Sequence, residues 1–406
     1  MSEKRIIEIE DKLMANVYAK RPVVITHGKG ALVWDVNGKE YIDCGGSYGT
    51  CIIGHCHPKV VEAIKKQAER LISCHGSLYN DVRAKLLEKI VSIAPKGLNK
   101  VFLSNSGAEA VECAIKLARK FTGKTEIIAM MGAFHGKTMG ALSATWDRKY
   151  RDPFKPLVPD FKHVPPDNLE KIKEALTNRT AAVIVEPIRG EGGIRVPPEG
   201  FMEGLDEICK EKGILLILDE VQTGFGRTGK TFACEHWNIN PDILCTAKSI
   251  AGGLPMGVTI AKDYIMECLK VGEHSTTYGG NPVVCAAACA AIDVLLEEDL
   301  PRRAATLGKY FKERLQELQS KHRIIREVRG LGLMLGVELK FEVLSIIMKA
   351  LDRGVIVLDA GKNVLRFLPP LVIEKTQIDQ VISVLDSILK EEESDRLSGA
   401  PSNSNA

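Results

Sequence analysis

Lys248 lies where a lysine side chain is costly to place. It follows an apolar run, residues 243–247, that is typical of a short buried strand. The segment after it, residues 249–255, contains glycines and a proline that prevent regular structure. A hydrated ammonium loses favourable solvation at the end of a buried strand. Lys248 is therefore either a Schiff-base or low-pKa nucleophile, or a lysine whose charged end reaches water at the sheet edge.

Ser106 begins a helix that directly follows another apolar strand. Ser106 and Glu109 form a capping-box pattern, so one interpretation is simply a well-capped helix. The other interpretation is a phosphate site, because the small residues Gly107 and Ala108 let an anion approach the free N–H groups of the first turn. The sequence Gly-x-x-x-x-Gly-Lys-Ser/Thr does not occur, which excludes a nucleotide P-loop of that type.

Asp219 follows the clearest central strand of the chain, residues 214–218. Open α/β sheets place ligands at the carboxyl ends of such strands. A carboxylate there can hold a protonated ring nitrogen, the charge pair that makes a pyridoxal ring an electron sink. Gln222, just beyond, could donate to the phenolic oxygen of that ring. The alternative is that Asp219 caps the following turn. Because Lys248 and Ser106 occur in the same chain, we favour the cofactor interpretation.

Two further strand ends carry residues that suit a cofactor or substrate site. Phe134 and His135 follow an apolar strand, and an aromatic ring at that point either stacks on a flat cofactor or packs in the core. Glu186 ends the strand at 181–185, and Glu191 follows it in a glycine-rich loop. Arg366 is flanked by apolar residues, where a guanidinium is usually paired and its fork fits a substrate carboxylate.

The bulk composition is that of a soluble globular enzyme. The chain has 406 residues, 45% of them hydrophobic and 26% charged, enough for two domains or for one large domain with an appendage. A net charge of +3 and 5% aromatic content give no case for nucleic-acid binding as the main activity. The longest apolar stretch, residues 282–296, contains Asp293 and is too short to span a bilayer.

The cysteines and histidines do not predict a metal site. The 11 cysteines show no repeated Cys-x-x-Cys spacing and no signal peptide precedes them, so we expect reduced thiols and a cytoplasmic protein. His55 and His57 resemble metal ligands, but no second cluster with zinc-finger spacing follows them.

The order of apolar segments predicts an α/β fold with a mostly parallel sheet. Helices alternate with short, continuously apolar strands at 100–103, 126–130, 181–185, 214–218, 242–246 and 257–261. We expect residues 58–290 to form this large domain and 291–390 a small α+β domain.

The small domain is predicted from a change of pattern along the chain. It should contain a charged helix at 306–320, a strand at 329–339, another helix and two short strands within 355–367. Residues 1–57 hold a helical pattern at 6–20 and a hairpin around Asn37-Gly38 that should pack on the small domain. Residues 391–406 should be disordered.

Several motifs together resemble the class III aminotransferases. They are Ser-Gly-Ala-Glu at 106–109, Phe-His-Gly at 134–136, Glu-Pro-Ile-Arg-Gly-Glu-Gly-Gly at 186–193, Leu-Asp-Glu-Val-Gln-Thr-Gly-Phe-Gly-Arg-Thr-Gly at 218–229, the Lys248 segment and Thr-Thr-Tyr-Gly-Gly-Asn-Pro at 276–282. The similarity extends from about residue 20 to 390. It implies a fold-type I enzyme that uses pyridoxal 5'-phosphate, with a large domain and a small domain built from both termini.

The resemblance also implies a role for each candidate residue. Lys248 would bind the cofactor covalently and move the proton, and Asp219 would pair with the ring nitrogen. The other cofactor-binding residues would be Ser106, Gly107, Ala108, Phe134, His135, Gln222 and Thr277, the last from the partner of a homodimer with shared sites. Arg366 would bind the α-carboxylate of glutamate or 2-oxoglutarate, and Glu191 would pair with Arg366 when an ω-amino substrate is bound. Glu186, Lys137 and Thr276 complete the implied substrate site.

Within that class the chain is similar to acetylornithine and ornithine aminotransferases. The segments around Trp146 and Arg366 most resemble the branch of lysine and arginine biosynthesis that acts on semialdehydes tethered to a small acidic amino-carrier protein. Basic residues after Trp146, namely Arg148, Lys149 and Arg151, together with Lys137, would form the rim that attracts this partner. Lys137 departs from the family, whose ornithine and acetylornithine members usually carry an arginine there.

Three other functions remain open at this stage. The amino substrate could be free N-acetylornithine or 4-aminobutyrate instead of a carrier-linked amine. The chain could also be a cofactor-free binding protein on the same fold, although the intact pair of Lys248 and Asp219 argues against a silent site.

Overall fold

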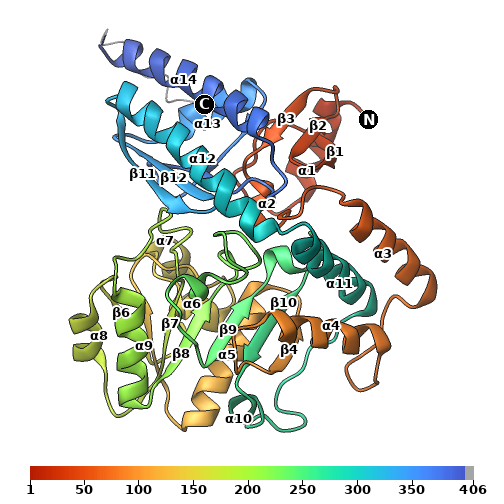
Figure 1. The fold of residues 1–406 in the computed structure, drawn as a ribbon, viewed down its shortest axis with the longest axis vertical. Coiled ribbons are helices and arrows are strands. Elements are labelled where there is room, and N and C mark those ends of the chain that lie inside the picture. Colours follow the sequence, from red (N-terminus) through yellow and green to blue (C-terminus); the bar gives the residue numbers. More distant parts are fainter. Residues whose placement is uncertain (398–406) are drawn as a thin grey trace.

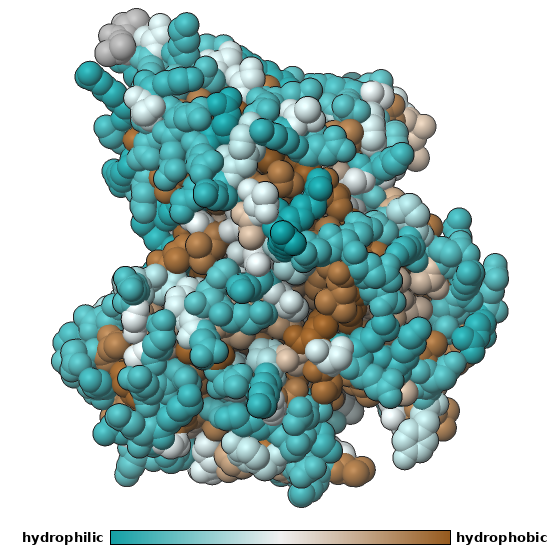
Figure 2. Space-filling view, in the orientation of Figure 1, coloured by the Kyte–Doolittle hydropathy of each residue, from teal (hydrophilic) through white to brown (hydrophobic). Residues whose placement is uncertain are grey.

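The computed structural model describes residues 1–397 of the chain, and its elements form two lobes (Figure 1). The lower lobe in this view is built around a seven-stranded sheet and the upper lobe around two four-stranded sheets. The face drawn in Figure 2 exposes apolar surface along the boundary between the lobes. Among the described residues no helix is long and apolar enough to cross a membrane.

The large sheet confirms the predicted mostly parallel α/β architecture. Its strand order is β4-β10-β9-β8-β7-β5-β6, and β10 alone runs antiparallel to its two neighbours. The bounds are β4 Lys100–Ser104, β5 Glu126–Met130, β6 Phe161–Val164, β7 Thr180–Val185, β8 Leu215–Asp219, β9 Ile243–Thr246 and β10 Gly257–Ala261. The short strand β6 was not predicted, because its sequence, Phe-Lys-His-Val, has no continuous apolar run.

Helices cover both faces of this sheet, which explains why its strands are apolar along their whole length. Along β5, Ile127 and Ala129 pack in one core with helix α5, while Ile128 and Met130 pack in another core with helix α9. The helices of this lobe are α3 Pro58–Arg70, α4 Asp81–Ile93, α5 Gly107–Thr122, α6 Met139–Ala144, α7 Arg148–Arg151, α8 Leu169–Ala175, α9 Phe201–Lys212, α10 Asp263–Met266 and α11 Pro282–Glu297. Short 3₁₀ turns lie at Asp152–Phe154, Ala233–His236 and Lys248–Ala251.

The upper lobe joins the two ends of the chain. The N-terminal part comprises α1 Glu3–Leu13, β1 Ile25–Lys29, β2 Leu32–Asp35, β3 Glu40–Asp43 and α2 Gly46–Gly49. The C-terminal part comprises α12 Leu300–Lys321, β11 Ile325–Leu331, β12 Met334–Leu339, α13 Leu344–Asp352, β13 Val355–Ile356, β14 Leu358–Asp359, β15 Val364–Phe367 and α14 Lys375–Leu397. Strand β13 pairs with β3 in a parallel arrangement, so the N-terminal hairpin does pack with the C-terminal unit.

Three element predictions are wrong in detail. The helix expected at 6–20 ends at Leu13. The strand expected at 329–339 is the hairpin β11–β12, which turns at Gly332 with a positive φ of 55°. Helix α14 continues through Glu391 to Leu397, because apolar residues up to Leu389 still pack in the core. The remainder of the expected tail, residues 398–406, lies outside the described residues.

Candidate active site

Lys248 stands directly after β9 and begins a 3₁₀ turn, with a left-handed φ of 42° that is rare for a residue other than glycine. The pKa of its amine is lowered to about 8, mainly by burial and also by the positive charge of Arg366; the carboxylates of Glu191, Glu186 and Asp219 oppose the shift. In the part of the chain that the structure describes, its Nζ has no hydrogen-bond or ion-pair partner. The amine is therefore substantially neutral near pH 8 and available as a nucleophile or proton acceptor.

Asp219 ends β8 and lies in a buried group of charged residues. Its Oδ2 is 2.7 Å from Nδ1 of His135, and its Oδ1 accepts from the backbone N–H of Val221 at 3.1 Å. The Asp219 and His135 side chains are both almost completely buried. The pair fixes the position of the carboxylate at the carboxyl edge of the sheet, where Lys248 also lies, just beyond the neighbouring strand β9.

Glu186 connects this group to two loops. Its carboxylate accepts from the backbone N–H of Phe134 at 2.9 Å and of Gly190 at 3.0 Å. The pKa of Glu186 is raised to about 7, mainly by burial and also by the Asp219 carboxylate, while His135 and the two N–H groups oppose the shift. Glu186 therefore holds the backbone of Phe134 and the start of the Glu191 loop around one carboxylate.

The helix start at Ser106 adjoins the strand of Asp219. Ser106 caps α5 by accepting from the N–H of Glu109 at 3.2 Å, while the Glu109 carboxylate accepts from the N–H of Asn105 at 2.7 Å. In a capping box the glutamate accepts from the backbone N–H of the capping residue itself, whereas here Glu109 accepts from the backbone N–H of Asn105 and from the Ser106 hydroxyl. A Cβ on Gly107 would lie 2.8 and 2.9 Å from the two methyl groups of Val221, so only glycine fits there.

Arg366 and Glu191 meet across the two lobes. Arg366, on β15, is 1% exposed and its Nη1 forms an ion pair with Oε1 of Glu191, whose side chain is 30% exposed. Tyr48 lies against the same guanidinium, with its ring centre 5.6 Å from Cζ. The residues predicted from the sequence at positions 366 and 191 are thus brought into direct contact, 175 residues apart in the chain.

The aromatic residue at the end of β5 has an unexpected neighbour. Phe134 packs edge-on against Tyr150 of α7, with ring centres 5.7 Å apart. The Nζ atoms of Lys137 and Lys149 lie 4.8 and 4.7 Å from the centre of the Tyr150 ring. Lys137 is exposed and is therefore placed at the surface beside Phe134 rather than among the buried charges.

Thr276 and Thr277 occupy a separate loop. Thr276 Oγ1 accepts from the side-chain amide of Asn105 at 3.0 Å, which ties this loop to the start of α5. Thr277 is exposed, and within residues 1–397 its side chain has no hydrogen bond. Within these residues of one chain the Thr277 side chain thus forms no hydrogen bond to any other candidate residue.

The residues present fit a pyridoxal phosphate at this place. Three polar atoms in the candidate site are buried without a hydrogen-bond partner: His135 Nε2, Gln222 Oε1 and Arg366 Nε. Buried polar atoms are normally paired, so unfilled ones in a candidate site indicate room for a polar ligand. The helix start at Ser106 suits a phosphate, the Asp219 carboxylate a ring nitrogen, and the Lys248 amine an aldehyde.

Sequence reasoning missed three residues that shape the site. Tyr48, Tyr150 and Thr145 contact Arg366, Phe134 and His135 respectively, and Thr145 Oγ1 accepts from the His135 N–H at 2.9 Å. For Tyr48 a signal exists, since glycines at 45, 46 and 49 surround it and its φ is 56°. For Tyr150 and Thr145 no local pattern distinguishes them from ordinary surface or core residues.

No group of three or more histidine, cysteine or acidic side chains within residues 1–397 has the arrangement of a metal site. Of the two histidines with a superficial metal-ligand pattern, His55 pairs with Asp43 at 2.8 Å and His57 with Glu298 at 3.2 Å. Both imidazoles are thus engaged with single carboxylates.

Comparison with known proteins extends over nearly the whole chain. Residues 13–389 match the family described as aminotransferase class-III. The chain is 49% identical to an acetylornithine aminotransferase of Methanopyrus kandleri, covering 94% of this chain and 98% of that one. It is 46% identical to a [LysW]-aminoadipate semialdehyde transaminase of Deinococcus radiodurans, covering 94% and 89%. An ornithine aminotransferase structure from Toxoplasma gondii, described with partial occupancy of PLP at its active site, superposes with a TM-score of 0.94 at 35% identity, covering 98% and 96%.

Proposed function

The chain belongs to the class-III aminotransferases, and we propose that it transfers an amino group between glutamate or 2-oxoglutarate and a semialdehyde at the end of a longer substrate. Aminotransferase activity and the use of pyridoxal 5'-phosphate follow from the family. The observation that best supports the proposed site is the half-buried Lys248 amine, with a pKa of about 8, at the same sheet edge as the Asp219–His135 pair.

The cofactor would be held by residues from four segments. Ser106, Gly107 and Ala108 would bind its phosphate, Asp219 its ring nitrogen and Phe134 one ring face. When bound, the cofactor supplies an electron sink that stabilises negative charge on the substrate carbon. His135 orients the Asp219 carboxylate, the group that would attract a protonated ring nitrogen.

The protein's own residues move the proton and select the substrate. Lys248 Nζ, neutral near pH 8, takes a proton from the substrate carbon and returns it elsewhere. Arg366 binds the α-carboxylate of glutamate through two parallel hydrogen bonds, which requires Glu191 to leave it. When the ω-amino substrate binds, Glu191 stays paired and neutralises Arg366. One site thereby accepts two substrates of different charge.

We propose a carrier-linked aminoadipate semialdehyde as the natural acceptor, with carrier-linked glutamate semialdehyde as a second one. A relative named for such a substrate supports this proposal, as do the exposed cations Lys137 and Lys149 beside Tyr150. A small acidic carrier protein would approach these cations faster by electrostatic steering. The second candidate is free N-acetylornithine, which the name of the Methanopyrus relative favours.

A homodimer with shared active sites is part of the proposal. Several large apolar residues between α3 and α4 are exposed in one chain: Leu71, Ile72, Leu78 and Tyr79. A cluster of this kind usually marks a surface that a partner covers. The exposed Thr277 would then reach the phosphate site of the other subunit. Sedimentation equilibrium tests this assembly directly, and a monomer at micromolar concentration would contradict it.

Kinetics with the two amino donors separate the substrate candidates. We expect kcat/KM for the carrier-linked amine to exceed that for free N-acetylornithine and to fall as salt rises from about 0.05 to 0.3 M, because salt screens exposed charges. Lys149→Glu should lower it further. Lys212→Glu, a charge reversal at the far end of α9, is the matched control and should change little. A better free substrate with no salt effect specific to the carrier would identify an acetylornithine aminotransferase instead.

A further inference from the structure

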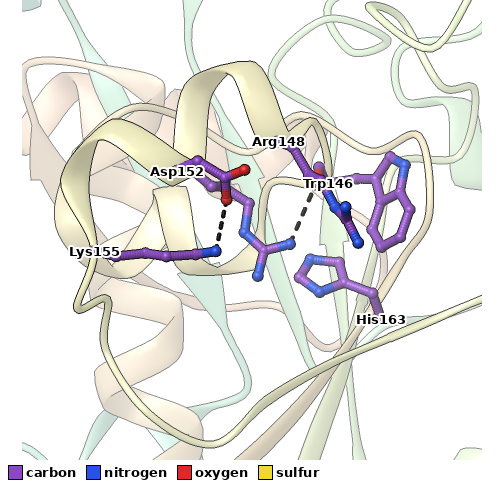
Figure 3. A pocket seen from close by; sticks show the side chains of 6 residues that line it. Trp146, Arg148, Asp152, Lys155 and His163 are labelled. Carbon is purple, nitrogen blue, oxygen red and sulfur yellow. Dashed lines mark hydrogen bonds and ion pairs between the residues drawn. The ribbon is translucent and has the colours of Figure 1, made fainter.

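A cavity lies beside the candidate active site and shares none of its residues. Its volume is about 480 Å³ and its lining residues are Trp146, Arg148, Arg151, Asp152, Lys155 and His163 (Figure 3). They come from helix α7, the 3₁₀ turn that follows it, strand β6 and the residues that flank the helix and the turn, Trp146 and Lys155. The proposed chemistry of Lys248, Asp219 and Arg366 gives this cavity no role.

The cations of this cavity have few partners. Arg151 Nη1 donates to the backbone oxygen of Trp146 at 3.4 Å, and its Nε is buried without a partner. The Arg148 guanidinium has no hydrogen bond or ion pair with any other residue in the range 1–397. Each guanidinium carries five N–H donors, so most of the donors here are free for an acceptor from outside the chain. Figure 3 shows Arg148, Trp146 and His163 close to one another.

The charge of the lining suits an anion with two negative charges. Asp152 is paired with Lys155 at 2.7 Å, so three cations and one carboxylate leave a net charge of +2. The pKa of His163 is lowered to about 4, mainly by burial and also by the positive charge of Arg151, so the imidazole adds no charge at neutral pH. Its Nε2 is engaged by the Ala144 carbonyl at 3.1 Å.

The Trp146 indole gives the cavity an apolar wall. Its ring lies 5.4 Å from the imidazole of His163, and both rings are partly buried. An ordinary cluster of solvated surface cations lacks a wall of partly buried rings such as Trp146 and His163. It also lacks a buried, unpaired guanidinium nitrogen such as Arg151 Nε.

We propose that this cavity is a binding site for a phosphate-type dianion, either inorganic phosphate or a phosphate monoester. Guanidinium groups bind such oxygens in pairs of parallel hydrogen bonds, and Arg148 and Arg151 supply two such forks. The ligand would also neutralise the positive charges of Arg148 and Arg151 on α7, the helix whose Tyr150 packs on Phe134. Occupation of the cavity therefore orders the segment that supports the proposed cofactor-stacking residue.

The test uses the holoenzyme, in which the cofactor already fills the phosphate cradle of the active site. Inorganic phosphate is titrated at constant ionic strength while tryptophan fluorescence is recorded. We expect a saturable change that disappears in Trp146→Phe. Arg151→Gln should weaken binding about tenfold or more, because hydrogen bonds to charged groups are strong. Lys212→Gln removes one exposed positive charge on α9 and should leave binding unchanged.

A gain of affinity gives an independent check. Asp152→Asn removes the one carboxylate of the lining and frees Lys155, so phosphate should bind more tightly. Should Arg151→Gln fail to fold, Asp152→Asn and Arg148→Ala decide the matter. The proposal fails if no saturation is seen up to about 10 mM, if the arginine variants bind as tightly as the native protein, or if Asp152→Asn does not bind more tightly. In a parallel titration, tighter binding of glycerol phosphate than of inorganic phosphate identifies the ligand as an ester, and weaker binding identifies it as free phosphate.

Discussion

Replacement of Glu191 by alanine should separate the two half-reactions. In the resting structure glutamate competes with Glu191 for Arg366, whose guanidinium is 1% exposed. Exposed ion pairs contribute up to about 1 kcal/mol and breaking a buried pair costs about 3–5 kcal/mol. Because the Glu191 side chain is 30% exposed, we place the cost of opening this pair at about 1–2 kcal/mol. Without Glu191, glutamate should therefore bind roughly 5- to 30-fold more tightly.

The ω-amino half-reaction of the same variant should become slower. An unmasked Arg366 attracts the carboxylates of any substrate and so favours a pose in which the wrong end reaches Lys248. Stopped-flow absorbance of the cofactor measures each half-reaction separately, and Glu199→Ala removes an exposed acidic residue of the same region as the control. Equal losses in both half-reactions, or weaker glutamate binding, would refute the proposed exchange of partners at Arg366.

Four other outcomes are expected. The purified protein should be yellow, and borohydride should attach the cofactor permanently to Lys248. Lys248→Ala should still bind the cofactor, but its turnover should fall by roughly 10²- to 10⁴-fold or more. A colourless protein that cannot be reconstituted with the cofactor would contradict this prediction. The rate of cofactor uptake by the cofactor-free protein should increase as pH rises towards about 8 and then level off. The reason is that the lowered pKa of Lys248 leaves its amine largely neutral above that pH. A rate that does not change from pH 6 to 9 would count against this amine as the nucleophile. Gly107→Ala should weaken cofactor binding without unfolding the protein, since its Cβ meets two methyl groups at 2.8 and 2.9 Å, whereas Gly76→Ala has open space and is the control. Burial alone would lower the pKa of His55, but its hydrogen bond to Asp43 outweighs this effect, and the pKa is raised to about 10. The ion pair therefore stabilises the fold fully below about pH 6.5, and this contribution is lost as pH rises through 10. The melting temperature of His55→Gln should differ from that of the native protein most at about pH 6 and least above about pH 10.

The local chemistry of the site was readable from the sequence. Lys248 and Asp219 each follow an uninterrupted apolar run, and such runs form strands whose carboxyl ends meet at one edge of a parallel sheet. Ser106 was readable as a helix start from the cap pattern of its own segment. These inferences rest on residues a few positions apart, where backbone geometry is set mainly by the sequence itself.

The contact between Arg366 and Glu191 could be established only from the tertiary structure. Reasoning from the residues could say only that Arg366 needs a partner, and the resemblance to a family was required to name Glu191. The contact itself depends on β15 of the upper lobe reaching a loop of the large sheet. The hairpin at Gly332 was missed for a similar reason, because its turn is fixed by the backbone of Arg227 and Thr228, within 2.4–2.6 Å of where a Cβ would lie.

The sequence by itself determined which groups are present and at which ends of which strands they stand, because hydrophobic periodicity and caps act over one or two turns. It also determined the family, through motifs spread along the chain. Only the tertiary structure decided the pKa values, since the shift at Lys248 depends on burial and on charges brought from Arg366, Glu191 and Glu186. Only the tertiary structure also shows the cavity at α7, where Arg151 of α7 and His163 of β6 line the same space. Distances between segments, and hence electrostatics, are set by packing that no local pattern records.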